Sequence, residues 1–155
     1  VETVSGDSEH SLEIQLPFLQ FVLGEFSLVP ILVGHGDVSG ADEIAGALAE
    51  NLDDGKTVFI ASSDMSHLTD YRELKRRDRA VAEALRAGDT EQVRRELSGP
   101  GTTVCGRVPV AAVMETCRRG GAAGTVLLHQ TNSADISGSA GGGYTVGYLS
   151  LAFVR

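Results

Sequence analysis

Residues Thr57–His67, TVFIASSDMSH, decide the fold that this sequence predicts. The run from Thr57 to Ala61 is β-branched and apolar, which is typical of a strand buried on both faces of a sheet. The chain then turns polar, and Asp64 and His67 follow three residues apart. In an open parallel sheet, binding and catalytic groups lie just beyond the carboxyl ends of the strands. This pair can act as an acid/base couple or within a metal site; alternatively, Asp64 only caps the next helix.

The segments on either side of this run alternate between strand and helix patterns. Apolar runs predict further strands at residues 26–33, 124–131 and 144–154. Helical spacing predicts helices at residues 8–24, from 39 to between 51 and 55, and at 70–87, 89–97 and 109–119. The charged run Lys75–Arg79 fits the solvated face of one of them. We expect one α/β domain over residues 1–155, a three-layer sandwich with a mixed, mostly parallel sheet.

The charge balance excludes several classes of partner. The 155 residues carry 13 Lys and Arg against 21 Asp and Glu, a formal net charge of −8. Such a chain is a poor match for nucleic acid or an anionic membrane surface. No run approaches the roughly 18 apolar residues of a membrane span, and the first residues do not resemble a signal peptide. We expect a cytoplasmic protein with no nucleic-acid or membrane partner.

The two cysteines lie in different contexts. Cys105 stands in a glycine-rich loop before a predicted helix, where unpaired N–H groups and the helix dipole stabilise a thiolate. A thiolate binds metals or acts as a nucleophile; the alternative is an inert buried cysteine. Cys117 lies on the apolar face of that helix, which predicts a core position. Their separation of about 18 Å along one helix is too long for a disulfide, which fits a reducing compartment.

His10 is the remaining candidate for a functional side chain. It follows Glu9 at the start of the first predicted helix. The sequence leaves two alternatives open, since His10 either faces a site or belongs to a solvated helix end.

Four segments, in this order, resemble the Memo family, also called AmmeMemoRadiSam system protein B. They are EHSLE with QLPF (9–13 and 15–18), PILVG (30–34), SSDMSH (62–67) and CGR followed by Pro109 (105–107). The ending Val146–Tyr148 also fits, so the resemblance covers nearly the whole chain.

The resemblance implies a fold similar to that of the class III extradiol (LigB-type) dioxygenases, which use non-haem iron. Memo-type proteins are thought to bind iron or copper and to act in redox chemistry, without an agreed substrate. By resemblance, Cys105 is a metal ligand, Asp64 and His67 line the same pocket as catalytic or assisting groups, and His10 lies close to it. The family association also suggests AMMECR1-like and radical SAM proteins as partners.

This sequence departs from the family pattern in two places. The N-terminal half of the family, with its two metal-binding histidines, is absent, and Ser137–Ser139 stands where the family usually has Ser-Gly-Asp. We therefore expect iron or copper in the intact protein and only weak binding by this chain alone. An incomplete sheet exposes an edge. The chain is thus expected to self-associate or to bind a polypeptide that supplies the missing half.

Three functions follow, in decreasing order of support. The first is a Memo-like metalloprotein, a metal-dependent oxidoreductase related to the dioxygenases. The alternative is a non-catalytic module that holds a peptide or small ligand in a vestigial cleft, with Cys105 as a redox-sensitive thiol only. The third is a thiol-dependent hydrolase, which needs Cys105 and His67 within hydrogen-bonding reach.

Overall fold

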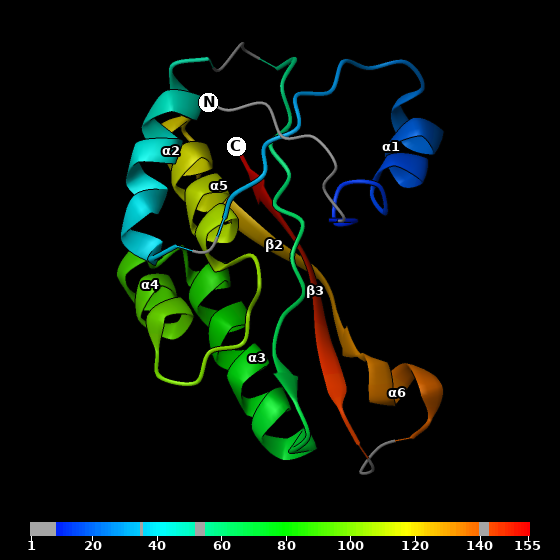
Figure 1. Ribbon diagram of the computed structural model, residues 1–155. Helices are drawn as coiled ribbons and strands as arrows, with labels where there is room; N and C mark the ends of the chain where they lie inside the picture. The colour runs from blue at the N-terminus through cyan, green and yellow to red at the C-terminus, as the bar shows by residue number, and fades with distance from the viewer. Residues whose placement is uncertain (1–8, 35, 52–54, 140–142) are drawn as a thin grey trace. The chain divides into compact units, whose positions relative to one another are not determined.

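The computed structural model of the chain describes residues 9–34, 36–51, 55–139 and 143–155 (Figure 1). The chain divides into two compact units, Val1–Leu32 and Val33–Arg155, and each is described by itself. A single domain over residues 1–155 would require these two units to be joined in one fixed arrangement. That arrangement is not described, so the single domain stays a prediction.

The first unit contains the helix α1 (Leu16–Leu23). The predicted helix was longer and began at Ser8, which lies outside the described residues. Pro17 falls in the first turn of α1, where a missing N–H costs nothing, so proline starts this helix rather than kinking it. No residue of α1 is buried, and Phe21 is 92% exposed. The helix therefore presents an uncovered apolar surface.

The helices of the second unit that precede β2 follow the sequence prediction closely. They are the short 3-10 helix η1 (Val38–Gly40), α2 (Ala41–Ala49), α3 (Tyr71–Ala87), α4 (Thr90–Ser98) and α5 (Arg107–Arg119). Asp70 and Asp89 cap α3 and α4, because their carboxylates accept hydrogen bonds from free N–H groups of the first turns. Gly88 ends α3 with φ of 68°, a conformation that favours glycine.

The sheet has the strand order β1–β3–β2, and both pairs are antiparallel. Its elements are β1 (His67–Leu68), β2 (Gly124–Asn132) and β3 (Thr145–Val154), with the short helix α6 (Ser133–Ser137) after β2. The long pair runs from Gly124 opposite Val154 to Asn132 opposite Gly147. β1 pairs only with the first two residues of β3.

The α/β class is confirmed, but the sheet differs from the prediction of a mixed, mostly parallel one. All strand pairs among the described residues are antiparallel. Parallel pairs need long crossover connections, whereas β2 and β3 follow each other through α6. The predicted strands 26–33 and 57–61 would have supplied parallel neighbours, but neither forms a ladder with described residues. An apolar run forms a buried strand only where a neighbouring strand is present to pair with it. The sequence pattern alone does not show whether that neighbour is there.

Helices α2, α3, α4 and α5 lie on one side of the β2–β3 pair, whereas α6 lies beyond the end of β2 (Figure 1). α3 packs against β2 and β3, α5 packs against β3, and Leu149, Leu151 and Phe153 join the core. Large apolar side chains nevertheless stay exposed on the strands, among them Leu128 and Tyr148. A third layer, as in the predicted sandwich, is not seen among the described residues. None of the helices described here has the length and apolar character needed to cross a membrane.

Candidate functional site

The polar residues at the end of the segment Thr57–His67 are held against the start of β3. The Met65 N–H donates to the carbonyl of Gly147 (2.9 Å), and the Gly147 N–H donates to the carbonyl of Ser66 (2.9 Å). β1 continues this pairing, with His67 opposite Val146. The His67 N–H donates to Thr103 Oγ1 at 2.7 Å, which ties the segment to the loop before α5. The backbone under His67 is thus fixed from two sides.

The loop that carries Cys105 is locked to the same segment through Ser63. The Gly106 N–H donates to Ser63 Oγ (2.8 Å), and Ser63 Oγ donates to the carbonyl of Asp64 (2.7 Å). A Cβ at Gly106 would overlap the Ser63 side chain, so this close approach requires glycine. The result is that Cys105 lies beside Asp64, although 41 residues separate them in the sequence.

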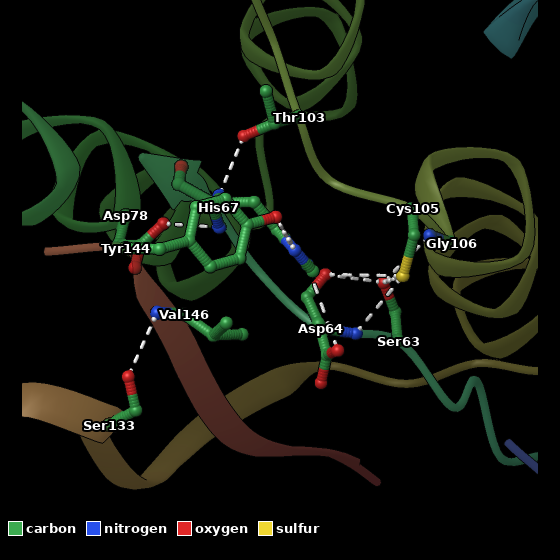
Figure 2. Close-up of polar contacts among 11 residues, drawn as sticks. Ser63, Asp64, His67, Asp78, Thr103, Cys105, Gly106, Ser133, Tyr144 and Val146 are labelled. Carbon is green, nitrogen blue, oxygen red and sulfur yellow. Dashed lines mark hydrogen bonds and ion pairs between the residues drawn. The ribbon is translucent and has the colours of Figure 1, made fainter. Parts of the chain in front are cut away.

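Asp64, His67 and Cys105 converge on one point (Figure 2). One ligand atom from each residue lies within 4.8 Å of the other two. His67 Nε2 stands 3.6 Å from Asp64 Oδ2. The structure thus brings together three residues that the sequence singled out, and their roles as site residues stay predictions.

The Cys105 sulfur lies against backbone and hydroxyl groups of the segment 63–64. The Asp64 N–H donates to Sγ at 3.3 Å, and Ser63 Oγ lies 3.6 Å from it. Sγ is also 3.7 Å from the carbonyl of Asp64, to which a protonated thiol can donate. α5 begins two residues later, and its N-terminus is a favourable place for negative charge. Cys105 is exposed and free, so reagents and metals have access to it.

The two ring nitrogens of His67 have different environments. Nδ1 lies 3.0 Å from the hydroxyl of Tyr144. Nε2 is buried and has no hydrogen-bond partner among the described residues, although the Asp64 carboxylate is near. A buried polar atom without a partner is uncommon and costs free energy.

A metal ion fits this donor set. A cation between Nε2, Asp64 and Cys105 would satisfy the orphaned ring nitrogen and would be attracted by the carboxylate. Sulfur and imidazole ligands suit iron, copper and zinc rather than magnesium or calcium. Three donors of three kinds leave the coordination sphere incomplete, so further ligands have to come from elsewhere.

His10 belongs to the first unit and is exposed there. Its backbone N–H donates to Glu9 Oε1 at 2.9 Å. Because the two units are described separately, a role for His10 at the cluster stays a prediction.

Sequence reasoning missed the residues that position the site, above all Asp78. The charged run Lys75–Arg79 was predicted to be a solvated helix face, which is wrong for Asp78: it is 3% exposed, and its Oδ1 accepts from the Ser66 N–H at 2.9 Å. Burial raises the pKa of Asp78, and the bond from Ser66 opposes that rise. A signal was present, since Asp78 lies four residues after Leu74 on the buried stripe of α3.

We expect Cys105 to react faster than Cys117 with a small alkylating reagent near neutral pH. Cys117 is half-buried, and burial raises the pKa of its thiol. A raised pKa reduces the thiolate fraction, and partial burial restricts access to the sulfur. Mass spectrometry after brief labelling of the folded chain should show faster labelling of Cys105 than of Cys117. Equal labelling of the two thiols would contradict the description of the Cys105 loop.

The comparisons with known proteins agree on one family. The Memo-like protein family matches residues 1–152. A MEMO1 family protein of Aeropyrum pernix is 37% identical over 92% of the chain and 51% of its own length. Those of Methanopyrus kandleri and Thermotoga neapolitana are 36% and 35% identical, over 96% of the chain and 53% and 52% of their own lengths. The chain thus spans about half the length of these relatives, and it belongs to the Memo-like protein family.

Proposed function

We propose that Asp64, His67 and Cys105 form part of an iron- or copper-binding centre in a longer Memo-like protein, and that this centre serves redox chemistry. The observation that carries the proposal is the buried Nε2 of His67, which has no hydrogen-bond partner among the described residues and lies beside a carboxylate and an exposed thiol. When bound, iron or copper supplies one-electron chemistry and reactivity toward dioxygen.

Each of the three residues has a distinct part in this proposal. Cys105 supplies the soft sulfur ligand, held by the Asp64 N–H and by the loop that Ser63 locks. His67 supplies Nε2. Asp64 supplies a carboxylate beside Nε2, and its side chain is 49% exposed. His10 is assigned to the same centre by resemblance alone.

The remainder of the longer protein is proposed to complete both the centre and the sheet. A non-haem iron site of the dioxygenase kind uses two histidines and a carboxylate, whereas this cluster has one histidine. A polypeptide corresponding to the other half of the relatives would add ligands. It would also extend the sheet toward the three-layer, mostly parallel arrangement related to class III extradiol dioxygenases. Alone, the chain is expected to bind metal weakly.

Equilibrium dialysis against Fe²⁺ and Cu⁺ under reducing conditions tests the proposal. The unchanged chain should bind up to one equivalent of metal, weakly enough to lose it on desalting. Cys105→Ser should weaken binding at least about tenfold, because a ligand is lost. Cys117→Ser is the matched control and should bind like the unchanged chain. Equal binding by Cys105→Ser would contradict the assignment of Cys105, and one equivalent retained through desalting would contradict the incomplete site.

A different function is favoured by a single observation. An apolar cavity of about 490 Å³ lies between residues 57–61, α5 and β3, with Ser63 and Met65 on its wall. Cavities of this size hold small ligands. A peptide or small apolar ligand bound there would make the chain a non-catalytic binding module, with Cys105 as a redox-sensitive thiol only. The absence of specific metal binding at any pH would favour this second function over the first.

A further inference from the structure

Tyr144 is placed beside His67 by the register of the sheet. It directly precedes β3, whose first residues Thr145 and Val146 pair with Leu68 and His67. Its hydroxyl lies 3.0 Å from His67 Nδ1, and the two rings meet edge to face with their centroids 5.9 Å apart (Figure 2). These contacts fix the ring so that Nδ1 faces the phenol.

The direction of the hydrogen bond between these rings decides what the other nitrogen offers. A neutral imidazole carries one proton. If Tyr144 donates to Nδ1, the proton is on Nε2 and points into the cluster. If Nδ1–H donates to Tyr144, Nε2 presents a lone pair there, as a metal ligand must.

The geometry around Nε2 favours the second arrangement. An Nε2–H group beside a carboxylate forms a charge-assisted hydrogen bond of about 2.7–2.9 Å, whereas Asp64 Oδ2 lies 3.6 Å away and the bond is not formed. Tyr144 is 67% exposed, so its own O–H can donate to solvent while its oxygen accepts from His67.

We propose that Tyr144 is a positioning residue for this site: its hydroxyl accepts a hydrogen bond from His67 Nδ1–H, so that the Nε2 lone pair faces Asp64 and Cys105. The inference deepens the proposed metal function, because it names the residue that prepares His67 as a ligand. It concerns the metal-free chain, however, and it can be tested without any metal.

Long-range ¹H–¹⁵N NMR of the chain labelled at histidine gives the tautomer of each ring. The His67 signals are assigned with His67→Gln, and all spectra are taken at one pH at which the His67 signals are those of a neutral ring. In the unchanged chain, His67 should be protonated on Nδ1. In Tyr144→Phe, which keeps the ring and removes the hydroxyl, the Nε2–H tautomer should gain population. Tyr148→Phe, on the same strand, should leave the tautomer unchanged.

The proposal is overturned if His67 carries its proton on Nε2 in the unchanged chain, or if Tyr144→Phe leaves the tautomer as it was. A change of equal size in Tyr148→Phe would also overturn it, because that would be a general effect of altering β3. In a second measurement, Tyr144→Phe should weaken metal binding about tenfold, as loss of a ligand's hydrogen-bond partner does. Suppose that neither the unchanged chain nor any variant binds metal, but that the tautomers behave as stated. The proposed metal function is then wrong, and the positioning role of Tyr144 is still supported.

Discussion

Light scattering of the chain at micromolar concentration should detect little free-standing monomer. The expected species are self-associated, and addition of a polypeptide that supplies the other half of the family protein should convert them to a defined complex. A large effect is expected because many large apolar side chains are exposed among the described residues.

Two regions of the second unit supply part of that surface. In the segment 57–61, Val58 is 73% and Ile60 48% exposed, although the run has the composition of a buried strand. On the sheet, Leu128 is 62% exposed, and β1 pairs with only the first two residues of β3, so the rest of that edge meets no strand among the described residues. Unpaired edges beside apolar surface drive association.

A charged substitution in the segment 57–61 tests whether this segment causes the self-association measured by light scattering. Val58→Lys should increase the monomer fraction, because lysine at an unpaired edge discourages strand pairing. Ile136→Lys is the matched control: Ile136 is 68% exposed on the short helix α6, away from this edge, and its change should leave association as it was. A stable monomer of the unchanged chain would contradict the incomplete sheet.

Gly147→Ala should damage both the fold and the site. Gly147 pairs with Met65 and Ser66 through its backbone, and a Cβ there would overlap the buried carboxylate of Asp78. Overpacking of this kind costs about 1–3 kcal/mol or more. Displacement of Asp78 would also release the Ser66 N–H that it holds next to His67.

Thermal unfolding at a fixed protein concentration measures this effect. A loss of about 3 kcal/mol lowers the Tm by roughly 6–12 °C for a chain of this size. Gly40→Ala is the matched control, since Gly40 has φ of −67° and no atom within 4 Å of an added Cβ. A Tm for Gly147→Ala within about one degree of that of Gly40→Ala would show that Asp78 and Gly147 are not packed as described.

Helices α2 to α5 and the strands β2 and β3 were predictable because their signals are local. Asp70, Asp89 and Gly88 mark the ends of α3 and α4 through interactions within a few residues, and the structure places them as the sequence indicates. β2 and β3 are adjacent in the chain and pair directly. Such elements need no knowledge of distant segments.

The sheet topology was not predictable from the same signals. An apolar run such as 57–61 indicates that its residues favour burial between neighbouring elements. It does not indicate which strands are present to pair with it. The parallel order was inferred from alternation of strands and helices, and that inference fails where a predicted strand lacks its partners.

At the candidate site, too, local signals were predictable and tertiary contacts were not. Asp64, His67 and Cys105 were found because their residue types stand at strand and helix ends, where sites form. Asp78 and Tyr144 were missed because their roles depend on tertiary contacts: one is buried under a strand pair, and the other meets His67 only through the register of β1 and β3. Neither contact leaves a pattern in the sequence beyond the position of Asp78 on an apolar stripe.

X-ray absorption at the metal edge tests the central claim most directly. With chain and iron or copper at millimolar concentration, a weak site is still filled, and the spectrum gives the atoms bound to the metal. A metal centre of Asp64, His67 and Cys105 should show one sulfur neighbour at about 2.3 Å together with nitrogen and oxygen neighbours. The sulfur should disappear in Cys105→Ser and remain in Cys117→Ser. A metal bound by nitrogen and oxygen alone in the unchanged chain, or a sulfur neighbour that persists in Cys105→Ser, would contradict the claim that Asp64, His67 and Cys105 form a metal centre.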